Sequence, residues 1–157
     1  MLRLEFHCHT LYSSDQNLIE RLATVDLLIG AVLVHRNEVI AAAHNDRENS
    51  QDPTAHAEML AIRRASEALG TFDLSGCILY TSCYPCPMCL GAILWARIKT
   101  VYYGASTKDA AEAGFDDGHF YDALGNPAAA LDLRPIDTPE AARLFWQWSA
   151  KADRKTY

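Results

Sequence analysis

Two short motifs constrain this chain more than any other feature: a His-Ala-Glu tripeptide and, about thirty residues later, a Pro-Cys-Pro-Met-Cys pentapeptide. Imidazole nitrogen and thiolate sulfur are ligands that zinc takes in a tetrahedral shell. A catalytic zinc site uses three protein ligands and leaves the fourth position to water. His56, Cys86 and Cys89 supply three ligands, and Glu58 stands beside them without being needed as one. We therefore expect the fold to bring both motifs to a single zinc ion.

The order and spacing of the motifs match the H-x-E … P-C-x-x-C signature of the zinc deaminases. In that class the zinc activates water, and the glutamate carries protons. This predicts that zinc-activated hydroxide attacks an amino-bearing ring carbon, with Glu58 as the proton shuttle. A closed, non-catalytic zinc-stabilised module is the alternative from another class, and Cys83 would then be the fourth ligand. A thioredoxin-like Cys86/Cys89 pair would leave the His-x-Glu half without a role.

Charge and cysteine content limit the kinds of partner that the chain is expected to bind and the compartment in which it is expected to act. The chain has 14 basic and 20 acidic residues, a net charge of −6. Proteins that bind phosphate backbones usually carry a basic stripe, so this balance favours a small-molecule substrate over nucleic acid. The longest apolar run, Leu27–Val34, is too short to span a bilayer, which argues against a membrane partner. Three of five cysteines cluster at 83–89, which favours metal binding in the cytoplasm over disulfides.

Segment patterns predict one α/β domain over residues 1–157. Apolar runs at Leu27–Val34 and Glu38–Ala43 flank a short polar turn, which predicts a β-hairpin. Further expected elements are a helix over Thr54–Leu69, a strand over Cys77–Thr81, a helix over Met88–Ala96, and strands over Thr100–Gly104 and Leu131–Arg134. The alternation from Cys77 onward predicts parallel neighbours in a mixed sheet of about five strands, within a three-layer α/β/α sandwich.

The remaining segments are polar, terminal or both. Asn45–Pro53 and Ala105–Asn126 are expected to be loops, the second walling or covering a pocket. A helix is expected from near Ser14, and a C-terminal helix at 138–157 begins with Thr138 as its cap.

The start of the chain allows a second metal hypothesis. His7-Cys8-His9 would place two imidazoles on one side of a strand, and residues 1–15 resemble the opening of the PHP phosphoesterases. The further His and Asp ligands of that family are missing downstream. The simpler interpretation is an N-terminal segment with partly buried His and Cys.

Stretches around and beyond the zinc motif resemble the bacterial guanine deaminases, a branch of the cytidine deaminase superfamily. They are Asp52–Glu58, Ile78–Cys83, Pro85–Ile93, Trp95–Arg97 and Asp109–Asp117, within a resemblance over about residues 28–157. It implies a cytidine deaminase-like fold, one zinc per chain, and hydrolysis of guanine to xanthine and ammonia in purine catabolism. Another aminated heterocycle or nucleoside (guanosine, cytosine, adenine, ammeline) remains the alternative substrate. A tRNA adenosine deaminase shares the motif, but the acidic charge and the Asp109–Asp117 stretch argue against it.

The resemblance also implies roles for four residues outside the zinc motif. Asn45 matches an asparagine that contacts the purine, and Trp95 matches an aromatic residue that lines the pocket. Asp117 matches an acid that reads the amidine edge and helps to pass protons. Family members are domain-swapped homodimers in which the last tyrosine closes the site, which makes Tyr157 a candidate. From the residues alone, turn or loop chemistry is the simpler explanation of Asn45 and Asp117.

Three features depart from the family pattern. Ile29 stands where the family has a phenylalanine that stacks on the purine, and Tyr84 stands where it has a glutamate. The segment 1–26 is atypical as well. Loss of a stacking ring is expected to weaken substrate binding by about 1–3 kcal/mol while leaving the chemistry intact.

Overall fold

The computed structural model describes residues 30–115, 117–125, 131 and 147–152 of the 157-residue chain. The described residues fall into two units, one ending at Tyr121 and one beginning at Asp122. The first unit contains the sheet and the predicted metal ligands. The expectation of a single deaminase domain over residues 1–157 stays a prediction.

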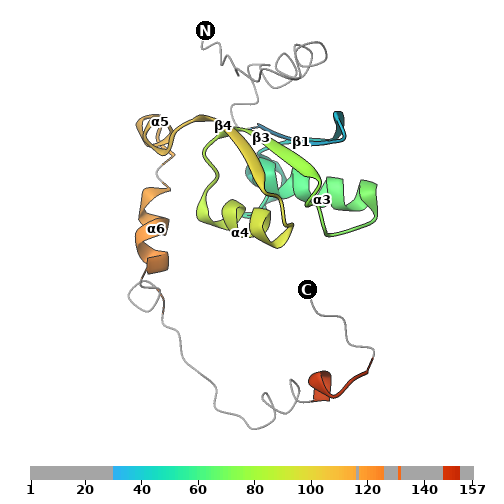
Figure 1. Cartoon of the computed structure of the whole chain (residues 1–157). Helices are drawn as coiled ribbons and strands as arrows, with labels where there is room; N and C mark the ends of the chain where they lie inside the picture. Colours follow the sequence, from blue (N-terminus) through green and yellow to red (C-terminus); the bar gives the residue numbers. More distant parts are fainter. Residues whose placement is uncertain (1–29, 116, 126–130, 132–146, 153–157) are drawn as a thin grey trace. The chain divides into compact units, whose positions relative to one another are not determined.

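A mixed four-stranded sheet organises the first unit (Figure 1). Its strands are β1 (Gly30–His35), β2 (Glu38–His44), β3 (Cys77–Cys83) and β4 (Thr100–Ala105), in the order β2-β1-β3-β4. β1 pairs antiparallel with both β2 and β3, whereas β3 and β4 are parallel. The predicted hairpin and the predicted parallel pair are therefore confirmed.

The hairpin turn has a simple local cause. Arg36 and Asn37, between β1 and β2, both have positive φ values, 50° and 66°. Two consecutive residues in the left-handed region match the twist of the flanking strands, and this makes such turns the favoured two-residue connections. Asn tolerates that region better than most residues, which explains its place in the turn.

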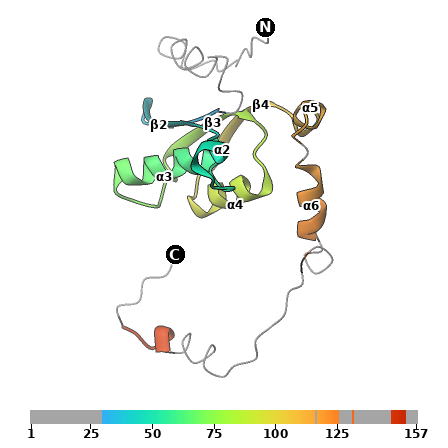
Figure 2. The same cartoon turned by 180° about the vertical axis from the view of Figure 1, so that it is seen from behind.

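Two helices pack on one face of the sheet, as both views show (Figures 1 and 2). They are α3 (Ala57–Leu69) and α4 (Pro87–Trp95), and α3 contacts β1, β2 and α4. The face that α3 turns to the sheet is made of Ala57, Ala61 and Ala65, all fully buried. These small side chains let the helix backbone lie close to the sheet.

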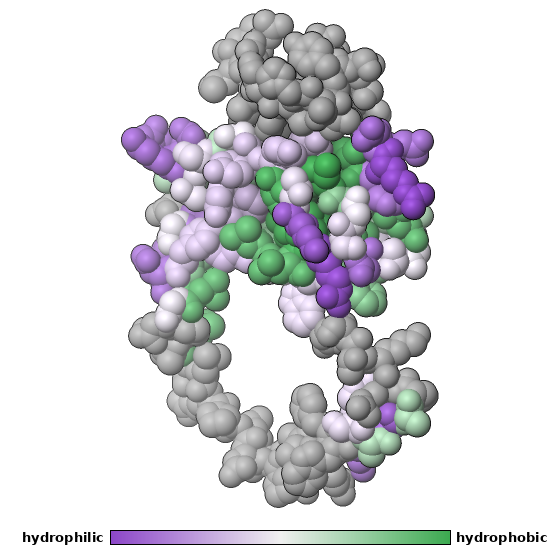
Figure 3. Space-filling view, in the orientation of Figure 1, coloured by the Kyte–Doolittle hydropathy of each residue, from purple (hydrophilic) through white to green (hydrophobic). Residues whose placement is uncertain are grey.

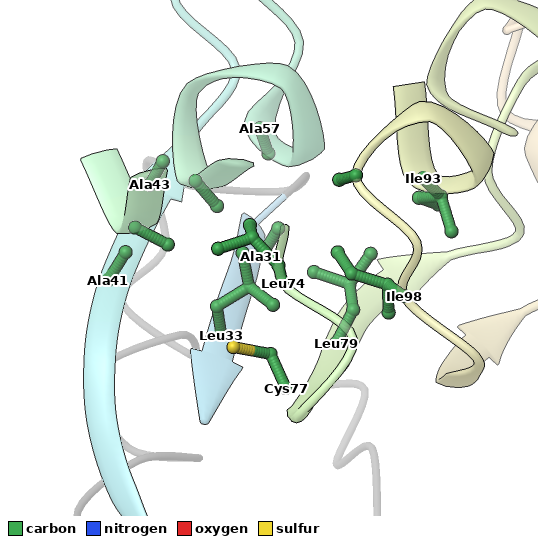
Figure 4. Close-up of a cluster of buried hydrophobic side chains, with 13 residues drawn as sticks. Ala31, Leu33, Ala41, Ala43, Ala57, Leu74, Cys77, Leu79, Ile93 and Ile98 are labelled. Atoms are coloured by element: carbon green, nitrogen blue, oxygen red, sulfur yellow. The ribbon is translucent and has the colours of Figure 1, made fainter. Parts of the chain in front are cut away.

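The main core lies between these helices and the sheet (Figure 4). Leu33 of β1 and Leu79 of β3 are fully buried there, with Ile93 of α4 beside them. A second, smaller cluster contains Val32, Val34 and Tyr80, which alternate with the core-facing residues and so lie on the opposite face. Both faces of the sheet are apolar, as expected for a sheet covered on two sides.

Helix α3 begins three residues later than the predicted Thr54. The Asp52 carboxylate accepts hydrogen bonds from the backbone N–H and the hydroxyl of Thr54, at 2.8 and 2.7 Å. This local turn holds the chain out of helical geometry until His56, which is the N-cap and not a first-turn residue. The helix ends at Leu69, as predicted, because Gly70 follows it in the left-handed region with φ 65°.

Both segments expected to be loops contain helices. The first holds the short helix α2 (Arg47–Ser50), and the second holds α5 (Thr107–Glu112) and α6 (Gly118–Gly125). At α5, the Ser106 side chain accepts from the N–H of Asp109, and the Asp109 carboxylate accepts from the N–H of Ser106. This reciprocal capping satisfies two backbone groups that would otherwise be unpaired, so a short polar segment can still be helical.

Several expectations lie outside the described residues. These are the helix near Ser14, the His7-Cys8-His9 site, Ile29, most of the expected strand at 131–134, most of the C-terminal helix at 138–157, and Tyr157. Four of about five expected strands are thus seen in the part of the chain that the structure describes. In that same part, every helix is too short or too polar to cross a membrane.

Candidate active site

The N-termini of helices α3 and α4 lie close together, and the predicted metal ligands are located at these two helix ends. His56 is the N-cap of α3, Cys86 is the N-cap of α4, and Cys89 lies in the first turn of α4. Their donor atoms all lie within 4.8 Å of one another. The Nδ1 atom of His56 is 3.6 Å from the Cys86 sulfur and 3.7 Å from the Cys89 sulfur. The prediction that the two motifs converge is therefore confirmed.

The two metal-binding cysteines, Cys86 and Cys89, follow the end of β3. After Cys83 the chain leaves the sheet, and the N–H of Tyr84 donates to the carbonyl of Ala105 at the end of β4, 2.8 Å away. Pro87 occupies the first turn of α4, where a missing N–H costs nothing. The carbonyl of Cys86 then accepts the first helical bond, from the N–H of Leu90. The cysteine pair is thus held between a strand end and a helix start.

The electrostatics of the three ligands suit a bound cation. A hydrogen bond from Cys89, and then one with His56, lowers the pKa of the Cys86 thiol. The bond with Cys86 also raises the pKa of His56. The pKa of Cys89 is raised, first by its bond to Cys86 and then by burial. Without a bound cation, Cys86 is thus the more readily ionised of the two thiols.

This donor set fits zinc. One imidazole nitrogen and two sulfurs are the three-ligand composition of a catalytic zinc site. A divalent cation between the sulfurs supplies the positive charge that two neighbouring thiolates need, and binding it releases their protons. Among the described residues the cluster contains three ligands, and Cys83 is outside it. The closed four-ligand alternative with Cys83 therefore gains no support.

Glu58 is buried against this cluster. It is the second residue of α3, and its side chain is 3% exposed. Its Oε1 accepts a hydrogen bond from the Thr81 hydroxyl at 2.8 Å, and its Oε2 lies 3.5 Å from the Cys89 sulfur. The carboxylate thus reaches the metal ligands without joining the cluster of donor atoms. A carboxylate in this place can exchange protons with a water at the site.

Asp117 lies near the same site, immediately before α6. Burial raises the pKa of its carboxyl group, and the negative charge of Cys86 raises it further. The positive charge of His56 acts in the opposite direction. Asp117 therefore lies within electrostatic reach of two of the metal ligands, and its contact with the substrate stays a prediction.

Asn45 and Trp95 are placed differently. Asn45 follows β2, and its side-chain oxygen accepts from the N–H of Arg47 at 3.3 Å, which is the turn chemistry that the residues alone suggested. Trp95 is the last residue of α4 and is 68% exposed. At a rise of about 1.5 Å per residue it lies about 13 Å along the helix from Cys86, so one protomer does not bring it to the ligands. The substrate contacts of both residues stay predictions.

Sequence reasoning missed two residues at the site. The hydroxyl of Tyr121, on α6, donates to the carbonyl of Pro85 at 2.9 Å, and burial raises the pKa of this phenol to about 12. Tyr121 follows Asp117 by four residues, a helical spacing that a loop interpretation hides. Thr81, the partner of Glu58, occupies a core-facing position of β3. A polar residue in that position of a buried strand was the available signal.

Comparisons with known proteins agree with this geometry. Residues 13–105 match the profile of the cytidine and deoxycytidylate deaminase zinc-binding region. This chain belongs to the cytidine and deoxycytidylate deaminase family. Its fold is therefore cytidine deaminase-like, its cofactor is zinc, and it is a hydrolytic deaminase, as the sequence predicted.

Three relatives indicate the branch of the family. The guanine deaminase of Bacillus subtilis is 48% identical over 130 residues, 82% of this chain and 83% of that protein, and its crystal structure superposes with a TM-score of 0.78. A structure in complex with 2,6-diaminopurine is 35% identical, with a TM-score of 0.55, over 57% of this chain and 51% of that chain. The tRNA-specific adenosine deaminase of B. subtilis is 54% identical, but over 77 residues, about half of either chain. Likeness to the guanine deaminase thus extends well past the shared zinc region.

Proposed function

We propose that this deaminase converts guanine and water to xanthine and ammonia. The observation that carries the proposal is the buried Glu58 carboxylate beside a three-ligand metal cluster. The choice of guanine rests on the match with the B. subtilis guanine deaminase, which includes the segments after β4. The match with a tRNA deaminase covers about half of the chain and lends that alternative less support.

His56, Cys86 and Cys89 hold the zinc in this proposal. Bound there, zinc acts as a Lewis acid that lowers the pKa of water to near neutrality and so supplies the nucleophile. The two helix N-termini add a favourable field for the thiolates that ligation requires. Since three protein ligands are used, the site keeps a position where water and substrate meet.

Glu58 moves the protons in this proposal. Its carboxylate takes a proton from the attacking water and delivers it to the ring nitrogen next to the amino-bearing carbon. A second transfer, to the departing amino group, completes the exchange of the amino group for oxygen. One water is consumed, one ammonia leaves, and Glu58 ends in its starting state. Proton transfer by a positioned carboxylate typically contributes about 10²- to 10⁴-fold to the rate.

Asp117 and Asn45 orient the purine in this proposal, with Trp95 and Tyr157 completing the pocket. Asp117 is supported by the charges of Cys86 and His56 that it experiences. A partly buried acid next to the site suits the donor edge of guanine, which presents N–H groups. Asn45 lies beside the short helix α2, whose Arg47 also affects the charge state of His56.

We also propose that the protein acts as a homodimer in the cytoplasm. Helix α4 has no charged residue, and Leu94 and Trp95 at its end are 74% and 68% exposed. Apolar surface lies on the face that α4 and β4 turn to the viewer in Figure 3, and a partner protomer is a natural cover for it. The described cysteines, Cys77 among them, are free thiols, which suits a reducing compartment. Light scattering on the zinc-loaded protein tests the dimer.

The test of the substrate is a panel of aminated heterocycles. Zinc-loaded protein is incubated with guanine, guanosine, adenine, cytosine, cytidine and ammeline, and ammonia and the deaminated product are measured. Xanthine and ammonia in equal amounts from guanine are the expected result. Turnover of another member without guanine would reject guanine and keep the deaminase chemistry.

A further inference from the structure

Thr81 is the least expected residue of the core. The core-facing positions of β3 are Cys77, Leu79 and Thr81, and all three are buried. Thr81 is 0% exposed, in a place where alternation predicts an apolar side chain. Valine has almost the same shape and would avoid the cost of burying a hydroxyl. A buried hydroxyl here therefore needs an explanation.

Its partner supplies that explanation. Among the described residues the buried polar side chains are Glu58 and Thr81, and they pair with each other. The hydroxyl donates to Oε1 of Glu58 at 2.8 Å, a charge-assisted bond of good length. The bond joins the first turn of α3 to β3, one of the two central strands of the sheet, 23 residues away.

The two oxygens of Glu58 consequently have different surroundings. Oε1 faces Thr81, and Oε2 faces the sulfur of Cys89 at 3.5 Å. When Cys89 ligates a metal it is a thiolate and has no proton to donate. The Thr81 hydroxyl is then the donor that still holds the carboxylate. Held at Oε1, the carboxylate cannot rotate freely, and Oε2 stays directed at the ligand cluster.

We propose that Thr81 is a positioning residue for Glu58, whose hydroxyl holds one carboxylate oxygen so that the other one is presented to the metal site. Thr81 does not touch the reacting atoms and acts through Glu58 alone. The inference rests on the proposed deaminase function, because it needs Glu58 to carry protons. It goes beyond that function because it assigns Thr81, a core residue of β3, a role in turnover as well as in packing.

The test compares two substitutions that separate shape from hydroxyl. Thr81→Val keeps the branched shape, and Thr81→Ser keeps the hydroxyl. In the zinc-loaded full-length protein, Thr81→Val is expected to lower kcat about tenfold to a hundredfold, the usual scale for losing a hydrogen bond to a charged group. KM and zinc content stay unchanged, and Thr81→Ser stays within about threefold of the wild type. Thr100→Val, the same change on the exposed strand position of β4, is the matched control.

A double-mutant cycle tests whether Thr81 acts through Glu58. In a Glu58→Gln background, Thr81→Val is expected to lower the residual rate by less than about twofold. Several results would overturn the proposal: a normal kcat for Thr81→Val, equal losses for Val and Ser, loss of zinc, or an undiminished effect without the carboxylate. A change in KM alone would also overturn it, because positioning of a proton carrier acts after binding.

Failure of the substrate proposal gives a different pattern. If the protein deaminates another member of the panel, guanine is rejected, and the same variants are compared on the accepted substrate. If no member is turned over, the proposed substrate is rejected, and the cycle is repeated with urea unfolding. For this measurement the background is Glu58→Ala, which removes the acceptor: a smaller midpoint shift by Thr81→Val there than in the wild type would support the buried bond, and equal shifts would refute it.

Discussion

Replacing Glu58 by glutamine isolates the proton-carrying role of its carboxylate. Glutamine has the same length and shape, and its side-chain oxygen can still accept from Thr81 at the 2.8 Å position of Oε1. Its NH₂ group replaces Oε2, 3.5 Å from the Cys89 sulfur, where it donates to a ligating thiolate. The fold and the zinc site should therefore survive the change, which removes the ability to take up a proton.

The expected loss is a fall in kcat of about 10²- to 10⁴-fold, or about 2.7–5.5 kcal/mol of transition-state stabilisation. Stability should change by only about 1 kcal/mol, since a charge-assisted hydrogen bond to Thr81 becomes a neutral one. The measurements are kcat and KM for guanine, the zinc content per chain, and urea unfolding. A normal zinc content with a much lower kcat is the informative combination.

Glu67→Gln is the matched control, because it is the same substitution on an exposed position of the same helix α3. It should leave kcat, zinc content and stability at wild-type values. A Glu58→Gln protein that keeps more than about a tenth of the wild-type kcat would refute the role of Glu58, because a carboxylate that moves protons contributes more than that. Loss of zinc in Glu58→Gln would instead show that this carboxylate supports the metal ligands.

Three further predictions concern the framework of the site. Gly70→Ala should lower the free energy of unfolding in urea by about 1–2 kcal/mol, because alanine is strained at a φ of +65°. The added Cβ meets no atom within 4 Å, so the effect measures the backbone strain alone. Leu79→Ala should cost about 2–5 kcal/mol in the same assay, because this side chain is fully buried in the main core, and a smaller loss would contradict that packing. Chelation of zinc should stop ammonia release and lower the melting temperature, because the ligands join α3 to α4. The free energy of unfolding should fall by about 2.7 kcal/mol relative to protein with free zinc at about 100 times its Kd. Added zinc should restore both the activity and the melting temperature.

Local patterns predicted the hairpin, the cores of the strands and the end of α3 at Leu69. They failed for α2, α5 and α6, because these helices are short, and α5 is capped by the individual side-chain bonds of Ser106 and Asp109. The start of α3 was displaced for a similar reason: the Asp52–Thr54 turn competes with the helix. Periodicity detects long amphipathic elements, whereas single side-chain bonds decide short ones.

The metal chemistry was determined by the sequence itself. Residue type and spacing are enough to assign His56, Cys86 and Cys89 to one zinc ion, because zinc selects its ligands by chemistry and few arrangements place all three together. The tertiary structure alone decided what supports them. Thr81 meets Glu58 across 23 residues, and Tyr121 meets the carbonyl of Pro85 across 36. Such contacts arise from the packing of α3 on the sheet and from the bond of Tyr121 to the cysteine segment, and no local pattern of side chains encodes them.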